Sequence, residues 1–272
     1  VRFPKPRASE AGGAGAGTVW QETMFGFRYI LERHALMAML VLFAGINLVL
    51  GFVSPIFIAF VLSFSSTTTM GSILSLGATG MLVGSIIASS WKVTDGRVAK
   101  LLVSIAALGV ALTVVGLSTW LVVVVGALWL GMLAVPIGNA MSQSIWMSKV
   151  EPDVQGRVFS ARAAVSQIGQ PIALLLAGPL VEGVFVPLME GESALSNLIA
   201  VFVGRGDHAG YAAFFVVIGI GTIALATLGW SYRPLRTLES TIPDAIADTG
   251  TVDTGASEAG TPEAGPRTPE PV

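Results

Sequence analysis

The feature that most constrains this chain is the apolar stretch between Val158 and Val186, which follows a charged segment. At roughly 1.5 Å per residue, a helix of this length is more than long enough to cross the ~30 Å hydrocarbon layer of a bilayer. The stretch also contains Gln167, Gln170 and Pro171. Pro171 has no N–H group to bond the carbonyl of Gln167, one turn earlier, and in a membrane that carbonyl must face protein or a water-filled cavity. The stretch therefore predicts a membrane helix that lines a pathway, rather than a plain anchor.

The composition agrees with a membrane protein and excludes several kinds of site. The chain is 53% hydrophobic and 12% charged, about half the charged fraction of an average soluble domain. It has no cysteine, which rules out disulfides and thiolate metal sites. His34 and His208 lie outside the apolar runs without a second ligand at metal spacing, and no phosphate-binding glycine loop is present. We therefore predict no enzyme, no catalytic residue, no metal site, no cofactor and no nucleic-acid partner.

Apolar runs of membrane length recur along the chain. The longest, residues 101–146, is too long for one crossing and contains a break before Trp120, a residue type favoured at membrane interfaces. We expect Ala194–Val203, between the last two runs, to lie in the interface. Dividing the longest run at its break predicts an all-α, polytopic membrane protein with six spans: residues 35–62, 70–91, 100–117, 120–146, 158–186 and 211–230.

The two ends of the chain differ in composition from the spans. Apolar residues at helical spacing, among them Met24 and Leu31, follow a capping-box pattern at Thr18–Gln21 and predict an amphipathic helix on the membrane surface. A helix packed against a partner domain is the alternative. The C-terminal end is rich in Thr, Asp, Glu, Gly, Ala and Pro and is expected to be disordered. This predicts a cytoplasmic linker with its interfacial helix, a membrane domain and a cytoplasmic tail: residues 1–33, 34–231 and 232–272.

The basic residues predict the orientation in the membrane. Of the 15 Lys and Arg residues, all but Arg205 fall in the segments on one side of the six spans. Because basic residues concentrate on the cytoplasmic side, both termini are expected to be cytoplasmic, in a multi-pass protein of the plasma membrane.

The second span carries small residues at every fourth position: Gly80, Gly84 and Ala88. Such residues let two helix backbones approach closely in lipid. We interpret them as a packing face, with direct substrate contact as the alternative.

Side-chain amides stand out within the spans because they are costly where they face lipid. We predict that they line a cavity; the alternative is that they tie helices together by hydrogen bonds. No Asp or Glu lies in the middle of a span, so a proton-coupling carboxylate is not visible. The candidates for the pathway are Asn47, Asn139, Gln143, Gln167 and Gln170.

Charged residues in the loops on the basic side form a second candidate group. Asp95 and Arg97 follow the second span, and Arg157 precedes the apolar part of the fifth. They are predicted to form a clasp that changes as the protein switches access, with solvated topology-determining charges as the alternative.

Several segments together resemble a known family. They are RFPKP in the linker, FGFRYILERHALMAMLVLFAGINLVLGF, EPDVQGRVFSARAAVSQIGQPIALLLAGPL, VFVPLM with GRGDHAGYAAFFVVIGI, and RPLRTLE. Over residues 2 to about 239, the chain resembles the C-terminal half of a major facilitator superfamily transporter, in its macrolide-efflux-like branch. The resemblance is most specific at Gly156-Arg157, Gln170-Pro171 and Gly178-Pro179-Leu180.

The resemblance implies that the six spans are the seventh to twelfth of a twelve-span fold, arranged as two inverted three-helix repeats. In that family, the counterparts of the first, second, fourth and fifth spans border a central cavity. Gly178-Pro179 resembles the family's Gly-Pro antiporter motif. Asp95-Gly96-Arg97 resembles its inter-helix Asp-Arg-Gly motif but lacks the basic pair that follows there, and Glu182 stands where this branch often has Asp. The candidates for conformational change are Asp95, Arg97, Gly156, Arg157, Pro171, Gly178 and Pro179.

The function that the resemblance implies is secondary active transport by alternating access. We expect export of a small, largely apolar compound, such as a drug or macrolide-like molecule, driven by an ion gradient. Transport of a nutrient, siderophore or lipid is an alternative, and a non-transporting membrane scaffold or assembly subunit is an alternative from another class. The expected partners are the small-molecule substrate, the lipid bilayer, and either an N-terminal six-helix half or a second copy of the chain.

Overall fold

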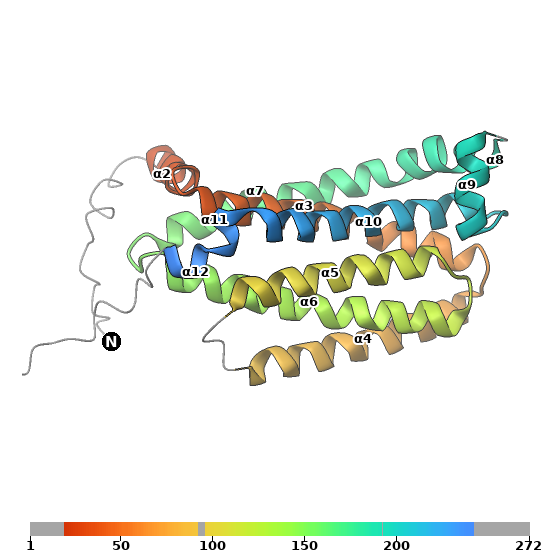
Figure 1. Cartoon of the computed structure of the whole chain (residues 1–272), viewed down its shortest axis with the longest axis horizontal. Coiled ribbons are helices and arrows are strands. Elements are labelled where there is room, and N and C mark those ends of the chain that lie inside the picture. Colours follow the sequence, from red (N-terminus) through yellow and green to blue (C-terminus); the bar gives the residue numbers. More distant parts are fainter. Residues whose placement is uncertain (1–18, 92–95, 192, 242–272) are drawn as a thin grey trace, which may run out of the picture.

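The computed structural model describes residues 19–91, 96–191 and 193–241, which contain helices and no strand. Six long helices lie side by side in one bundle (Figure 1). Each is long and apolar enough to cross a membrane. The six predicted spans are therefore confirmed, with ends that differ by a few residues. The helices are α3 (His34–Leu62), α4 (Thr67–Ser90), α5 (Arg97–Gly116), α6 (Leu121–Lys149), α7 (Gln155–Leu180) and α10 (Ala209–Ser231).

The fifth span is one continuous helical segment despite its prolines. Pro171 and Pro179 both lie inside α7. Directly after Leu180, the last residue of α7, the backbone widens into a π-helical turn, η1 (Val181–Phe185), and then returns to an α-helix in α8 (Val186–Glu190). Such turns relax a helix locally and are frequent at functional sites.

The packing of the helices has the two-fold pattern of an inverted repeat. The first repeat is α3, α4 and α5, and the second is α6, α7 and α10. The middle helix of each repeat packs along the first helix of the other, α4 on α6 and α7 on α3, and the two third helices, α5 and α10, pack together. This reciprocal packing of equivalent helices confirms the predicted pair of three-helix repeats.

Glycines bring α4 against α6, as the small-residue pattern predicted. A Cβ atom on Gly80 would lie 2.5 Å from the carbonyl oxygen of Trp129, and one on Gly84 would lie 2.8 Å from Pro136 Cγ. Gly77, one turn before Gly80, has the same role against Leu128. The packing interpretation of this face is therefore confirmed.

Aromatic rings join α3 and α10 at the end of the bundle that contains η1. Phe60 and Phe215 are buried with ring centroids 5.5 Å apart, and Phe214 lies 5.3 Å from Phe185 of η1 in an edge-to-face arrangement. These contacts connect the π-helical turn to the packed core.

The predicted amphipathic helix is present as α2 (Val19–Leu31). One face packs on the start of α7: Gly26 lies against the backbone of Arg157, and Tyr29 and Ile30 are buried. Burial raises the pKa of the Tyr29 hydroxyl above its ordinary value. Met24 and Leu31 remain 47% and 58% exposed. Their contact with a membrane surface stays a prediction, and Thr18 of the capping box lies outside the described residues.

The tail is structured where it begins, contrary to the prediction. Two short helices, α11 (Arg233–Arg236) and α12 (Leu238–Thr241), continue the chain past residue 232, and Leu235 and Leu238 are buried. The Glu239 carboxylate accepts hydrogen bonds from the N–H groups of Gly96 and Val98, at 3.0 and 2.8 Å. It therefore caps the N-terminus of α5, which stabilises this order. Residues 242–272 lie outside the described part.

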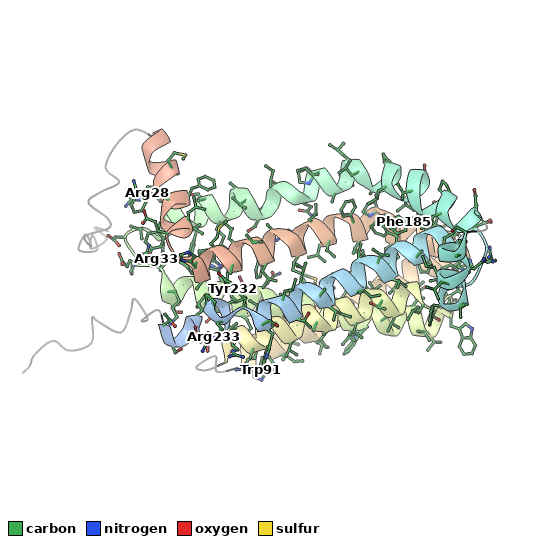
Figure 2. All side chains as sticks on the ribbon, turned by 45° about the horizontal axis from the view of Figure 1, so that its top comes forward. Arg28, Arg33, Trp91, Phe185, Tyr232 and Arg233 are labelled. Atoms are coloured by element: carbon green, nitrogen blue, oxygen red, sulfur yellow. The ribbon has the colours of Figure 1, made fainter. Side chains whose placement is uncertain are left out.

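The two ends of the bundle differ in charge. Figure 2 shows Arg28, Arg33 and Arg233 at one end and Phe185 toward the other. The second end carries the short helix α9 (Ala194–Val203), whose bounds are those of the predicted interfacial segment. Its position in a membrane interface stays a prediction.

Candidate functional site

The structure brings the five predicted pathway residues together. They border a single hollow of about 360 Å³, formed by α3, α6 and α7. α3 belongs to the first repeat, whereas α6 and α7 belong to the second. The hollow is lined by Phe43, Asn47, Asn139, Gln143, Phe159, Arg162, Ala163, Ser166, Gln167 and Gln170.

Close packing of α3 on α7 fixes the position of this wall. A Cβ atom on Gly51 would lie 2.8 Å from the Ala173 Cβ and 3.0 Å from the Gln170 Cα. Gly169 similarly lies against Leu48. Because these backbones approach closely, α7 presents Gln170 toward the hollow at a fixed height along α3.

The amides in the hollow are largely free of bonds to neighbouring helices. Asn47 donates to the Phe43 carbonyl of its own helix at 2.9 Å. Within the described ranges, Asn139, Gln167 and Gln170 make no hydrogen bond to protein, and all three side chains are exposed. Gln143 alone of the five is bonded to another helix. The geometry therefore offers hydrogen-bonding groups to a ligand or to water more than it ties helices together.

Arg162 is the main residue of the hollow that sequence reasoning missed. Its guanidinium donates to Gln143 Oε1 at 2.9 Å and to Ser142 Oγ at 3.1 Å. It also lies over the rings of Trp146 and Phe43, 5.2 and 5.6 Å from their centroids. From the sequence alone, this arginine is interpreted only as one of the basic residues that predict the orientation, near the start of a span. Its spacing of four from Ser166, and of eight from Gln170, was the signal that it shares their face.

Two buried polar atoms lack partners among the described residues, one in the hollow and one in the tryptophan beside Arg162. Ser166 is 6% exposed and Trp146 is fully buried. Among the described residues, neither Ser166 Oγ nor Trp146 Nε1 has a hydrogen-bond partner. Buried polar groups are normally satisfied, so an unsatisfied hydroxyl beside a hollow marks a position where a ligand or water would be favoured.

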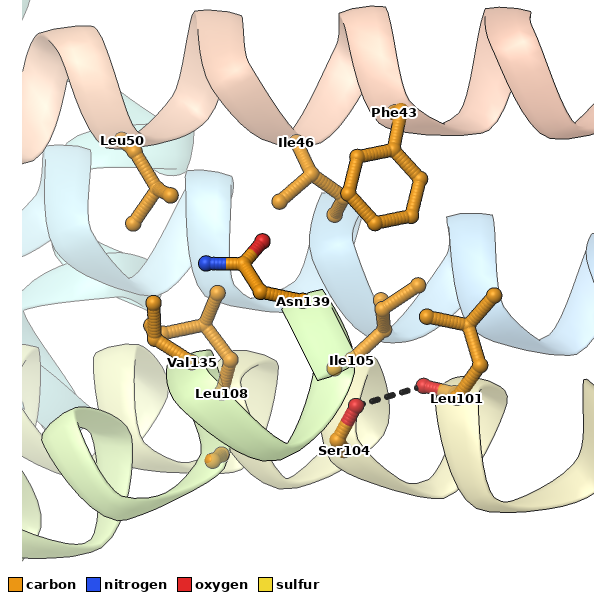
Figure 3. Close-up of a pocket in the computed structure, with 11 residues that line it drawn as sticks. Phe43, Ile46, Leu50, Leu101, Ser104, Ile105, Leu108, Val135 and Asn139 are labelled. Atoms are coloured by element: carbon orange, nitrogen blue, oxygen red, sulfur yellow. Dashed lines mark hydrogen bonds between the residues drawn. The ribbon is translucent and has the colours of Figure 1, made fainter. Parts of the chain in front are cut away.

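An apolar crevice adjoins the polar hollow. It has a volume of about 30 Å³ and shares Phe43 and Asn139 with the hollow. Figure 3 shows the Asn139 amide among apolar side chains from three helices, including Ile46 and Ile105. Ser104 in the same crevice is satisfied by the Leu101 carbonyl at 2.7 Å. The two spaces together are polar on one side and apolar on the other.

The loop charges predicted to form a clasp contact different elements. The Arg97 guanidinium donates to Ser148 Oγ of α6 at 2.6 Å, whereas that of Arg157 lies 4.5 Å from the ring centroid of Phe25 in α2. Asp95 lies outside the described residues. Their gating role stays a prediction.

The remaining conformational candidates lie on exposed parts of α7. A Cβ atom on Gly156 or Gly178 would meet no atom within 4 Å, so packing inside this bundle does not require glycine there. Pro171 and Pro179 are exposed as well. No group of three or more His, Asp or Glu that could hold a metal ion occurs in the described ranges.

Six membrane-length helices in two inverted repeats, with a polar hollow between them, define the chain as part of a membrane transporter. The family model of the Major Facilitator Superfamily matches residues 2–174. The chain belongs to this superfamily.

Curated proteins that match part of this chain are named for macrolide efflux. Macrolide efflux protein A of Streptococcus pyogenes is 30% identical over 118 residues, which cover 42% of this chain and 29% of that protein. Macrolide efflux protein A of Enterococcus faecalis is 30% identical over 115 residues, covering 41% of this chain and 35% of that protein. The chain thus matches about a third of the length of these relatives, and no solved structure matches it.

Proposed function

We propose that this chain is one half of an alternating-access efflux carrier that exports a small, largely apolar compound, such as a drug or macrolide-like molecule, driven by an ion gradient. The observation that carries the proposal is the hollow itself. Amides from α3, α6 and α7 converge there, and most of them have no partner in the described chain. Weak, adaptable contacts of this kind suit a compound that must bind and then leave.

The efflux direction and the kind of substrate rest on the relatives. The matched proteins are named for macrolide efflux, and the match falls on a chain whose hollow adjoins apolar surface. Apolar walls with a few polar groups are typical of sites for drug-sized ligands. Both features favour an amphipathic organic substrate over a sugar or a metal ion.

A second six-helix half is the expected partner of this one. α4 and α7 are the least buried of the six spans. α7 itself borders the hollow, and α4 packs on α6, which also borders it. Apolar side chains such as Leu82 and Leu175 are 66% and 76% exposed on α4 and α7. We propose that this surface meets the other half, in the same polypeptide or in a second copy, and that the pathway runs between them.

We infer the orientation from the basic residues at one end of the bundle. The arginines of α2, α7 and α11 lie at the end that also contains α12. By the positive-inside rule, we place this end, with both termini, in the cytoplasm and the protein in the plasma membrane.

The test is drug accumulation in cells that express the full reading frame containing this chain, in a host without its main efflux pumps. We expect lower accumulation of amphipathic drugs than with an empty vector, and recovery of accumulation when a protonophore collapses the gradient. Gln170→Leu should restore accumulation at unchanged membrane abundance. Thr227→Val, which removes an exposed hydroxyl from α10, is the matched control and should not. Accumulation equal to the empty vector for every drug would contradict the proposal and favour a scaffold role.

A further inference from the structure

The polar hollow contains a cation and no carboxylate among its lining residues. We propose that it binds the acidic group of an amphipathic organic anion, held by the Arg162 guanidinium and the Ser166 hydroxyl. The inference rests on the proposed transport function and names the class of its substrate: a small apolar body that carries a carboxylate, sulfonate or phosphate.

The first observation is that the guanidinium of Arg162 has N–H donors that its hydrogen bonds to protein do not use. Its two protein acceptors, Gln143 Oε1 and Ser142 Oγ, are both neutral. A guanidinium has more N–H donors than these two bonds use. No carboxylate lies within ion-pair distance of it in the described ranges. The guanidinium is therefore fixed in place with donors and charge still available.

The position of this charge also matters. An arginine near a helix end normally extends its long side chain to the membrane surface. Arg162 instead bonds to α6 and lies over the rings of Phe43 and Trp146, inside the bundle. A charge kept among protein groups of low polarity repels a cationic ligand and attracts an anionic one.

The second observation is independent of the charge. Ser166 lies one helical turn after Arg162, lines the same hollow and is almost fully buried without a partner for its hydroxyl among the described residues. Residues at this spacing are neighbours on a helix face. An oxyanion beside them accepts bonds from the planar guanidinium and from the hydroxyl at once, which satisfies both groups.

The hollow, at about 360 Å³, has room for the rest of such a ligand, and the crevice of about 30 Å³ adds an apolar border on one side of it. Phe43 and Asn139 border both spaces, and beyond them the walls are Ile46, Leu50 and Ile105. A ligand with its acidic group at Arg162 thus places its apolar part toward α3 and α5. The arrangement selects anionic amphiphiles over neutral and cationic ones of the same shape.

The experiment compares three probes with one naphthyl body: 2-naphthylacetate, 2-naphthylacetamide and 2-naphthylethylamine. The protein from the full reading frame is placed in phosphatidylcholine nanodiscs, and binding is measured by equilibrium dialysis with empty nanodiscs subtracted. We expect the acid to bind at least about tenfold more tightly than the amide or the amine, about 1.4 kcal/mol. Ser166→Ala should reduce this preference in part.

Two variants decide the role of Arg162. Arg162→Gln removes the charge, and Gln143→Glu, nearly isosteric, supplies an internal carboxylate at the position of its present acceptor. Both should abolish the preference for the acid. Arg205 is an exposed arginine in the loop after α9, and it is hydrogen-bonded to Asn197 of that helix. Arg205→Gln should leave the preference for the acid intact. If Arg162→Gln fails to fold, Gln143→Glu decides alone, because a purely structural arginine would gain a partner there without any change in probe preference.

Phosphatidylglycerol nanodiscs separate the two sources of such an anion. Weaker probe binding there assigns the site to a lipid headgroup, and unchanged binding assigns it to a soluble amphiphile; both support an anion site. Absence of an acid preference in the unmodified protein, including absence of measurable acid binding, overturns the inference, as does a preference that survives Gln143→Glu. Because binding is read without transport, these results leave the drug-accumulation test of the carrier unaffected.

Discussion

The contact between α4 and α6 gives a prediction whose size follows from the structure. A Cβ atom added at Gly84 would lie 2.8 Å from Pro136 Cγ and 3.0 Å from the carbonyl carbon of Leu133, and closer still to the oxygen. Ordinary contact between carbon atoms begins near 3.5 Å, so the two helices must separate locally by roughly 1 Å. α4 packs mainly on α6, and no other helix replaces the lost contact.

The expected cost is that of an overpacked interface, about 1–3 kcal/mol of the free energy of unfolding for Gly84→Ala. At about 2–4 °C per kcal/mol for a chain of this size, the midpoint of thermal unfolding should fall by about 2–12 °C. Gly84→Leu should be worse and should lower membrane abundance. The assay is the monodisperse fraction of a fluorescent fusion in detergent after heating.

A matched glycine in the same helix separates packing from helix propensity. Gly71 also lies in α4, but a Cβ atom there would meet nothing within 4 Å. Gly71→Ala should leave the midpoint unchanged or raise it, since alanine favours a helix over glycine by about 0.5–1 kcal/mol. Equal midpoints for Gly84→Ala and the unmodified protein, or an equal fall for Gly71→Ala, would refute the close-packing argument.

Three further predictions concern the ends and the pathway. Glu239→Ala removes the cap of α5 and should lower the free energy of unfolding by about 1 kcal/mol, measured as a shift in thermal midpoint; an unchanged midpoint would mean that the cap contributes nothing. Gln170→Leu should reduce efflux severalfold at unchanged membrane abundance, read by drug accumulation and immunoblot, and loss of protein instead would make its role structural. Because the chain has no cysteine, single cysteines report topology: Ser65→Cys and Ser193→Cys should react with an impermeant maleimide in intact cells and Asp153→Cys only after lysis, and one reversal would break the proposed orientation.

Hydropathy and length made the six spans predictable. A membrane leaves few choices for an apolar run, since every backbone group must be bonded within a helix. The α4–α6 contact was equally predictable from the sequence, because close approach of two helices in lipid requires small residues at a helical spacing. Gly77 was missed because it precedes Gly80 by three residues and therefore falls outside the every-fourth pattern, although a spacing of three also places residues on one helix face.

The hollow was predictable in part. Asn47, Asn139 and Gln167 are costly against lipid, so their shared side of the bundle followed from the sequence. Arg162 did not, because an arginine near the start of a span satisfies the topology rule equally well. Its contacts with Ser142 and Gln143 depend on where α6 passes α7, which spacing along one helix does not reveal.

The average composition of the tail did not indicate that its first residues form helices. Leu235 and Leu238 are two apolar residues in a long polar segment, and their burial requires a groove built by other helices. Glu239 acts on the N-terminus of α5, far away in sequence. Such long-range contacts leave no local pattern.

The central claim is that the hollow is an aqueous pathway rather than a sealed or lipid-facing surface. The most direct measurement compares Gln167→Cys with Ile168→Cys, neighbours in α7 at the same depth and both exposed in the structure, in the full reading frame without other cysteines. Gln167 borders the hollow, whereas Ile168 does not. We predict that a charged, water-soluble thiol reagent modifies Gln167→Cys in native membranes and blocks efflux, while Ile168→Cys remains unmodified. Absence of modification at Gln167→Cys, or equal modification at both positions, would contradict the claim.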